Sequence, residues 1–187
     1  MNSQIGQDEW VLRTLNYKRG GYFLDIGAFD GVQISNTWYM EKNLDWTGIC
    51  IEAGAENYKG LVKNRNCTCL NLALFNKNSI VEFAENWTVG KIGAGQSIVS
   101  ITFPKLLKKY NVPKVIDYIS LDIEGMEYEV LKLFPFKSYH VNCWSIEYNA
   151  YEDGGVMRDK IRELMKDYIL VPSGHDFEDW FVNPKIC

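Results

Sequence analysis

The stretch Phe23-Leu24-Asp25-Ile26-Gly27-Ala28-Phe29-Asp30-Gly31 is an apolar run that leads directly into the pattern Asp-x-Gly-x-x-Asp-Gly. We interpret the run as a buried parallel strand and the residues after Ile26 as the turn at its carboxyl end. Open α/β sheets bind ligands outside the carboxyl ends of their strands. Gly27 and Gly31 favour this interpretation, because a residue without a Cβ lets the chain turn sharply and lets a ligand approach its backbone. The stretch therefore predicts a ligand site.

Helical and strand patterns alternate around this stretch. The expected elements, in chain order, are a helix from Gln7 to Lys18 ended by Gly20-Gly21, the strand Tyr22 to Ile26, a helix from an Asn36-Thr37 cap to about Asn43, a strand from Gly48 to Glu52, a helix from about Glu56 to Asn64 and a strand from Cys69 to Leu74. This β-α-β-α-β order predicts a parallel sheet with right-handed crossovers.

The middle of the chain has a different pattern. Ser79 to Glu85 alternates like an exposed strand, and Gly90 to Gly95 is rich enough in glycine to predict a mobile loop without regular structure. The remaining expected elements are a helix around Phe103 to Tyr110 with Pro104 in its first turn, a strand from Val115 to Leu121, a helix from Met126 to Leu133, a strand from Val141 to Glu147, a helix from Met157 to Met165, and short strands near Tyr168 to Val171 and Trp180 to Val182. Nothing divides the chain, so we expect one domain over residues 1–187.

Composition limits the classes of function. The 187 residues are 47% apolar and 24% charged, which is enough for a sizeable core, and the net charge of -4 predicts no nucleic-acid surface. No apolar run approaches the roughly 20 residues of a transmembrane helix, and the start of the chain lacks a signal-peptide core. We therefore expect a cytoplasmic protein with no membrane insertion. Its five cysteines contain no Cys-x-x-Cys pattern, so we expect reduced thiols and no disulfide framework or zinc site.

Glu52 points to a ligand that contains ribose. It ends the second expected strand, 21 residues after Gly31, where doubly wound nucleotide-binding proteins place an acid that holds the ribose hydroxyls. The dinucleotide fingerprint G-x-G-x-x-G is absent, and the segment from Phe23 to Thr37 has two aspartates and no Lys or Arg. These features suit a cationic ligand without pyrophosphate, such as S-adenosylmethionine. A turn-forming role for Asp25 is the structural alternative.

Three acids are expected to meet in the same cleft. Asp122 and Glu124 follow the strand that ends at Leu121, and Glu147 ends the next strand. Carboxylates can take the proton of a hydroxyl nucleophile directly, or they can hold a divalent cation that lowers the pKa of the hydroxyl. The structural alternative is that Asp122 and Glu124 cap the following helix and that Glu147 pairs with a lysine.

The chain resembles the FkbM-type S-adenosylmethionine-dependent methyltransferases over nearly its whole length. The resemblance is carried by Ser3 to Asp8, Phe23 to Gly31, Ser35 to Thr37, Trp46 to Glu52 and Asp117 to Gly125, with Asp176 to Val182 as the closing strand. It implies an α/β, Rossmann-like class I methyltransferase fold, with a mostly parallel seven-stranded sheet and helices on both faces. It also implies O-methylation, commonly of a sugar or natural-product hydroxyl.

The resemblance also implies the residues of the site. The expected cofactor-binding residues are Gln7, Asp25, Gly27, Ala28, Asp30, Gly31, Asn36, Thr37, Glu52 and Ala53, and the expected catalytic residues are Asp122, Glu124, Glu147 and His175. Ala53 stands where the family often has proline, which leaves the shape of the adenosine pocket open at that point. Similarity to sugar O-methyltransferases that hold magnesium implies that Asp122 and Glu147 bind Mg²⁺ or Mn²⁺.

The sequence allows more than one interpretation of several residues and of the function. His175 is a candidate base or a solvated histidine in a turn, and His140 is expected to be structural. Gln4, Gln7 and Asp8 are placed to fold over the cofactor, although a helix N-terminus accounts for Asp8 without a ligand. The glycine-rich loop from Gly90 to Ser97 is expected to touch a small-molecule or glycan acceptor. An NAD(P)-dependent oxidoreductase and a non-catalytic partner of a glycan enzyme are the alternative functions, and the oligomeric state is open.

Overall fold

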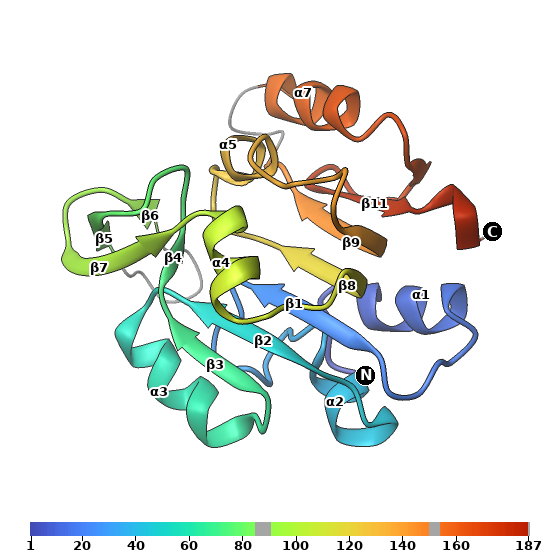
Figure 1. The fold of residues 1–187 in the computed structure, drawn as a ribbon, viewed down its shortest axis with the longest axis horizontal. Coiled ribbons are helices and arrows are strands. Elements are labelled where there is room, and N and C mark those ends of the chain that lie inside the picture. Colours follow the sequence, from blue (N-terminus) through green and yellow to red (C-terminus); the bar gives the residue numbers. More distant parts are fainter. Residues whose placement is uncertain (85–90, 150–153, 187) are drawn as a thin grey trace.

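The computed structural model describes residues 1–84, 91–149 and 154–186, and a seven-stranded sheet forms its centre (Figure 1). In spatial order the strands are β10 (Ile169–Val171), β11 (Glu178–Val182), β9 (His140–Glu147), β8 (Val115–Leu121), β1 (Tyr22–Ile26), β2 (Thr47–Glu52) and β3 (Thr68–Asn71). The strands from β9 to β3 are parallel, and β11 runs antiparallel to both of its neighbours. The predicted mostly parallel sheet is confirmed. Because β2 and β8 flank β1 on opposite sides, the strand order reverses at β1, which is where such sheets bind ligands.

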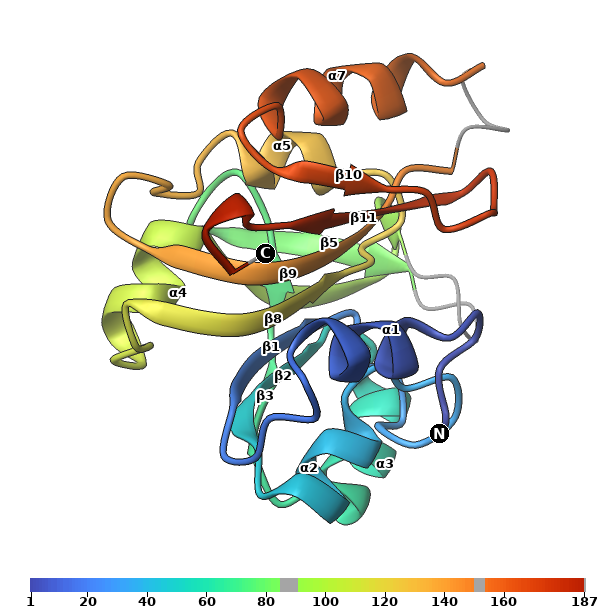
Figure 2. The same ribbon diagram turned by 90° about the vertical axis from the view of Figure 1, so that its right-hand side faces the viewer.

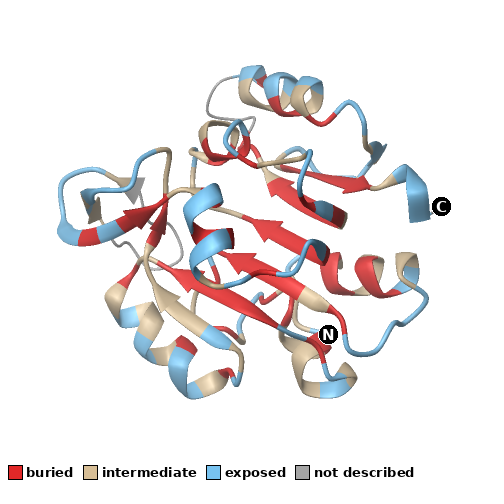
Figure 3. Ribbon diagram, in the orientation of Figure 1, coloured by how far each residue is buried: buried red, intermediate tan, exposed pale blue. Residues whose placement is uncertain are grey.

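Helices cover both faces of this sheet, as Figures 1 and 2 show. One face carries α1 (Gln7–Thr14), α2 (Trp38–Leu44) and α3 (Ala55–Asn64), and the other carries α4 (Phe103–Lys109), α5 (Glu127–Leu131) and α7 (Val156–Leu164). Buried residues concentrate in the strands between these layers (Figure 3). Successive side chains of β1 point to opposite faces of the sheet and contribute to two hydrophobic clusters. Leu24 packs in the cluster that includes Phe103, and Phe23 packs in the cluster that includes Val11.

A second, four-stranded sheet projects beyond the edge of the main one (Figure 1). Its order is β4 (Ala73–Leu74), β7 (Gln96–Ile101), β5 (Ile80–Ala84) and β6 (Lys91–Ile92). The exposed strand predicted from Ser79 to Glu85 corresponds to β5. The prediction that the glycine-rich segment lacks regular structure is wrong for Lys91 and Ile92, which pair with β5, and β7 was not predicted; Gly90 lies outside the described residues. A Cβ on Gly95 would lie 2.0 Å from the carbonyl oxygen of Phe83, so this glycine permits a close approach of two backbone segments.

Several predicted boundaries also differ. The helix expected to reach Lys18 ends at Thr14, because Asn16 and Tyr17 have left-handed backbone conformations. The strand predicted from Cys69 to Leu74 is two strands, since β4 leaves the main sheet and pairs with β7. The last strand begins at Glu178, two residues earlier than predicted. α5 covers Glu127–Leu131 and is shorter than the helix predicted from Met126 to Leu133.

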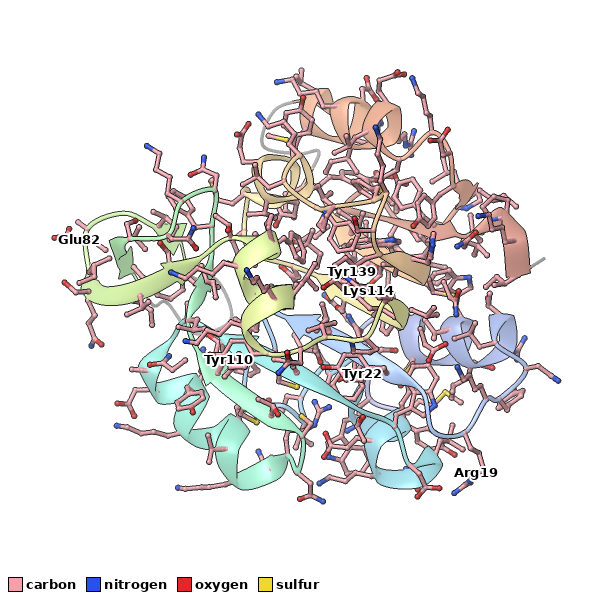
Figure 4. The ribbon with its side chains drawn as sticks, viewed as in Figure 1. Arg19, Tyr22, Glu82, Tyr110, Lys114 and Tyr139 are labelled. Atoms are coloured by element: carbon pink, nitrogen blue, oxygen red, sulfur yellow. The ribbon has the colours of Figure 1, made fainter. Side chains whose placement is uncertain are left out.

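Side chains also pack together at the opposite end of the sheet, where β8 and β9 begin. The Lys114 ammonium lies 3.8 Å from the ring centroid of Tyr139, and Figure 4 shows the two side chains together beside β8. His140, at the start of β9, donates its backbone N–H to the carbonyl of Lys114 and is exposed. Among the residues that the structure describes, none of the helices combines the length and the hydropathy needed to cross a bilayer.

Candidate functional site

A cavity lies at the carboxyl ends of the central strands. The turn after β1, the ends of β2, β8 and β9 and the start of β11 line it, together with residues from the start of α1 and from the small sheet. It therefore occupies the position that the sheet topology predicts. The predicted residues in its wall are Gln4, Gln7, Asp25, Gly27, Ala28, Asn36, Glu52, Ala53, Asp122, Glu124 and Glu147.

Gly27 brings two strand ends together. The N–H groups of Gly27 and Ala28 both donate to the carbonyl of Ile51, each at 3.0 Å, so the turn after β1 is fastened to β2. Gly27 has a φ of 86°, and a Cβ there would lie 1.8 Å from the backbone oxygen of Asp122. Only glycine allows this contact, which places Asp122 directly beside the turn.

Glu52 is fixed at the end of β2 by backbone donors. Its Oε2 accepts the N–H of Phe29 at 2.9 Å, and its Oε1 accepts the N–H of Gly54 at 2.6 Å. The residue is 8% exposed and lines the cavity. Because a carboxylate has about four acceptor positions, it can hold this geometry and still accept the hydroxyls of a ribose.

Asp25 is held by a buried network on the face of the sheet that carries α1, α2 and α3. Its Oδ2 accepts the hydroxyl of Thr37 at 2.5 Å and lies 3.7 Å from Arg65 Nη1, and Arg65 Nη2 donates to Thr37 Oγ1 at 2.9 Å. Burial raises the pKa of Asp25, while Arg65 and Thr37 oppose that rise. Asp25 still lines the cavity, but Thr37 is fully buried outside its wall, so the structure gives Thr37 a structural position.

Four other predicted residues also lie outside the cavity wall. Asp30 Oδ1 accepts the backbone N–H groups of Val32 and Gln33 at 2.9 and 2.8 Å, which is a turn-forming role, and Gly31 lies within the same turn. His175 is exposed and its ring contacts Phe177 at 5.4 Å between centroids. Asp8 binds the segment before α1 by accepting Ser3 Oγ–H at 2.5 Å.

Asn36 presents an acceptor that has no partner among the described residues. Its Nδ2 donates to Ser120 Oγ at 2.9 Å, whereas its buried Oδ1 accepts no hydrogen bond from the described part of the chain. A buried acceptor without a donor is costly, so such an atom in a cavity wall marks a position for a ligand donor. An ammonium group supplies a donor of this kind.

The three expected acids meet in the cavity wall. Asp122, Glu124 and Glu147 each offer a carboxylate oxygen within 4.8 Å of the others. Burial raises the pKa of Asp122 and of Glu147, and the neighbouring Asp122 carboxylate raises the pKa of Glu147 further. Asn149 Nδ2 donates to Glu147 Oε2 at 2.9 Å and reaches Glu124 Oε2 at 3.5 Å, which orients both carboxylates.

The turn that carries Glu124 is organised by Glu127, which the sequence analysis missed. Glu124 and Gly125 have φ values of 57° and 104°, and the Glu127 carboxylate accepts the N–H groups of Ile123 at 2.8 Å and Gly125 at 3.0 Å. Glu127 is 1% exposed, and burial raises its pKa to about 7. The sequence signal for this role was the position of Glu127 three residues after Glu124, from which its side chain can accept hydrogen bonds from the preceding turn.

Glu178 is another missed residue of the cavity wall. It is 5% exposed, accepts Gln7 Nε2–H at 3.1 Å and also accepts the indole N–H of Trp180, and burial raises its pKa to about 7. Trp180 stacks on Trp10 of α1 with centroids 4.7 Å apart. Glu178 was missed because the strand was predicted to begin two residues later. In the antiparallel pair of β11 and β9, the first residue of β11 lies opposite Glu147, the last residue of β9.

Apolar side chains complete the wall on the side of the small sheet and of the loop before β11. They are Phe83 of β5, Ile92 of β6 and Phe177. Ile92 belongs to the Gly90 to Ser97 segment expected to touch the acceptor. Ile51, Leu72 and Leu74 line the part next to β2 and β3, where Asn57 adds a polar group.

Comparison with solved structures places this fold among methyltransferases. The precorrin-6y C5,15-methyltransferase of Geobacter metallireducens GS-15 aligns with a TM-score of 0.55 at 12% identity, covering 94% of this chain and 87% of that one. The methyltransferase FkbM of Methylobacillus flagellatus KT aligns with a TM-score of 0.56 at 16% identity, covering 87% of this chain and 43% of that one, so this chain spans less than half of that protein. A human methyltransferase 10 domain containing protein aligns with a TM-score of 0.52 at 9% identity, covering 93% of this chain and 78% of that one. No curated protein sequence matches the chain significantly.

The sheet order is that of class I methyltransferase structures, and the cavity lies at the carboxyl ends of its central strands. The model of the methyltransferase FkbM domain matches residues 25–170, and the chain belongs to that family. The described residues fit the cofactor. Glu52 lines the cavity at the end of β2, Asn36 Oδ1 accepts no hydrogen bond from the described residues, and apolar groups lie beside β2 and β3.

Proposed function

We propose that the chain, acting as one domain, transfers the methyl group of S-adenosylmethionine to a hydroxyl of a sugar or glycan. The observation that carries this proposal is the group of carboxylates in the cavity wall, where Asp122, Glu124 and Glu147 have oxygens within 4.8 Å of one another. A neutral hydroxyl is a weak nucleophile until a group takes its proton, and a carboxylate pair with raised pKa values is suited to that role near neutral pH.

The protein residues have separate roles in this reaction. Glu52 binds the ribose and Asn36 accepts the ammonium, which fixes the position of the cofactor. The cofactor supplies an electrophilic methyl group. The ionised member of the Asp122–Glu147 pair accepts the proton of the acceptor hydroxyl, and Asn149 holds Glu147 in position. The apolar wall excludes water from the site.

The wall formed by Phe83, Ile92 and Phe177 supports a carbohydrate acceptor. Aromatic rings present flat apolar faces on which the C–H face of a sugar can pack, while the acids receive its hydroxyls. The family resemblance points to the same class of acceptor.

A divalent metal is a further part of the proposal. Asp122, Glu124 and Glu147 provide three hard oxygen ligands, the donor type that Mg²⁺ and Mn²⁺ prefer. A bound metal would lower the pKa of the hydroxyl, and in that case Asp122 and Glu147 would act as ligands. Activity that survives exhaustive chelation undiminished would exclude the metal.

The first experiment is calorimetric titration with S-adenosylhomocysteine of the wild type and Glu52→Gln. We expect the variant to lose roughly 1–3 kcal/mol of binding free energy, since a buried hydrogen-bonding position becomes mismatched. Glu56→Gln is the matched control, because Glu56 lies on α3 outside the cavity wall, and it should bind like the wild type. Absence of binding to the wild type would overturn cofactor use and favour a non-catalytic partner. Equal binding by the Glu52 variant would remove Glu52 from the site.

The second experiment is an acceptor screen with labelled S-adenosylmethionine. Transfer to monosaccharides or glycans should give a methyl ether that survives mild alkali, whereas a methyl ester formed on a carboxyl group would be hydrolysed. Transfer only to amines or carboxylates would overturn O-methylation of a hydroxyl.

A further inference from the structure

Three cysteines lie together at the edge of the main sheet, outside the cavity wall. Cys50 is in β2, Cys69 is opposite it in β3, and Cys67 immediately precedes β3. The Sγ atoms of Cys50 and Cys67 are 3.5 Å apart. Cys50 is fully buried, whereas Cys67 is partly exposed, so a reagent in solvent reaches Cys67 first.

The surroundings of Cys67 favour a thiolate. The hydrogen bond from the Cys50 thiol lowers the pKa of Cys67, and the nearby Arg65 guanidinium lowers it further, while burial acts in the opposite direction. Burial raises the pKa of Cys50, so Cys50 keeps its proton. Thiolate character together with partial exposure is what makes a cysteine nucleophilic towards oxidants.

Cys50 is better placed than Cys69 as the second thiol. The Cys69 Sγ is directed to the backbone carbonyl of Cys67 at 3.6 Å, whereas the Cys50 Sγ faces the Cys67 sulfur itself. Cys67 also lies before the first residue of β3 that is in register with β2, which is Thr68. The shift of roughly 1.5 Å that would shorten the sulfur separation to a bond of about 2.05 Å therefore falls on a segment outside the strand pairing.

We propose that Cys67 and Cys50 form a redox-modification site that reacts with a hydroperoxide. The Cys67 thiolate attacks the terminal peroxide oxygen, the O–O bond breaks, the alcohol or water leaves with a proton from solvent, and Cys67 becomes a sulfenic acid. The Cys50 sulfur then attacks the Cys67 sulfur, and water leaves with the Cys50 proton. The two thiols are oxidised by two electrons to a disulfide, and the peroxide is reduced.

The bridge would connect two segments that shape the cofactor cavity. Cys50 lies two residues before Glu52 in β2, and Cys67 lies two residues after Arg65, which binds Asp25 and Thr37. Oxidation would therefore act next to the residues that hold the turn after β1. The site does not depend on the identity of the methyl acceptor.

The test is thiol mapping of the reduced full-length protein after brief treatment with hydrogen peroxide. Alkylation under denaturing conditions should modify five thiols before oxidation and three after it, with the intact mass lower by about 2 Da before alkylation. Tryptic digestion should give peptide 43–59 linked to peptide 66–77, and fragmentation should place the bridge on Cys67.

Two variants complete the test. Cys67→Ser should keep all four of its thiols after oxidation, whereas the matched control Cys69→Ser should still lose two. Retention of all five thiols in the wild type, a bridge to Cys69 or to another chain, or oxygen addition at Cys67 without a bridge would each overturn the proposal. Because mapping of the wild type answers the question directly, a variant that fails to fold leaves the conclusion unaffected.

Discussion

At the scale of single residues, the cavity depends on Gly27. Its φ of 86° is unfavourable for a residue with a side chain, and the carbonyl of Asp122 occupies the space that a Cβ would take. The glycine therefore determines how closely the ends of β1 and β8 approach. A larger residue would have to move either the turn or the strand end that carries Asp122.

We expect Gly27→Ala to lower the free energy of unfolding by at least about 2 kcal/mol, because backbone strain and a backbone clash add together. Gly93→Ala is the matched control, since a Cβ there would have no atom within 4 Å, and it should change stability by at most about 0.5 kcal/mol. Chemical denaturation followed by circular dichroism measures both. Equal stability of the two variants would show that the close approach at Gly27 is absent.

The sequence located single residues correctly where local position along a strand decides their place in the fold. Glu52 was placed from its strand end and its offset from Gly31, and it lines the cavity. Thr37 was assigned to the cofactor, yet its partners are Asp25 and Arg65. Arg65 lies 40 residues beyond Asp25, and no local pattern indicates that their side chains meet inside the fold.

At the scale of elements, the connection from β8 to α5 is held in shape by its own side chain. The Glu127 carboxylate accepts two backbone N–H groups of the turn before it, and the turn places Glu124 beside Asp122. This arrangement buries an acid whose charged form is poorly solvated. The pKa of Glu127 is therefore raised to about 7, compared with an ordinary value of 4.5.

We expect the stability difference between the wild type and Glu127→Gln to depend on pH. A raised carboxyl pKa stabilises the fold below about pH 4.5, and this contribution is lost as the pH rises to about 7, because the buried group must ionise. Glutamine does not ionise, so the variant should gain up to about 3 kcal/mol relative to the wild type between about pH 5 and about pH 8. Denaturant titrations at both pH values measure the change. A pH-independent difference would contradict the raised pKa.

Element prediction from the sequence was most reliable for long periodic segments. The strands of the parallel sheet have continuous apolar runs and were found, whereas the two-residue β6 beside three glycines carries no such signal. The apolar run from Cys69 to Leu74 was predicted as one strand, but its last two residues form β4, which pairs with the distant β7. Tertiary pairing, and not propensity, decides these short elements.

At the scale of the whole molecule, the fold assembles acids that are distant in the sequence. Asp122 and Glu124 follow β8, Glu147 ends β9 and Glu178 begins β11, and they come into one cavity wall only when the seven-stranded sheet is complete. Burial and the like charge of Asp122 at close range raise the pKa of Glu147, which favours the form of Glu147 that carries a proton. A cation bound there would replace that proton.

This exchange predicts how the stability of the whole protein responds to Mg²⁺ or Mn²⁺. Metal ligands must be deprotonated, and the pKa values of Asp122 and Glu147 are raised, so metal binding should strengthen as the pH rises. We expect millimolar Mn²⁺ to raise the unfolding midpoint more at about pH 8 than at about pH 6, because at a fixed ligand concentration tighter binding stabilises the folded state more. Differential scanning calorimetry measures this shift.

Glu147→Gln separates this effect from general ionic screening. The variant keeps the shape of the side chain and loses one charged ligand, so the Mn²⁺-dependent rise should fall at both pH values, while Glu56→Gln, on exposed α3 surface, should retain it. The pKa of Glu178 is also raised to about 7, so protonated Glu178 stabilises the fold at low pH and this contribution is lost as the pH rises from about 4.5 to about 7. The unfolding midpoint of the metal-free wild type should therefore fall over the same range. A midpoint that Mn²⁺ leaves unchanged at both pH values would contradict metal binding at Asp122 and Glu147.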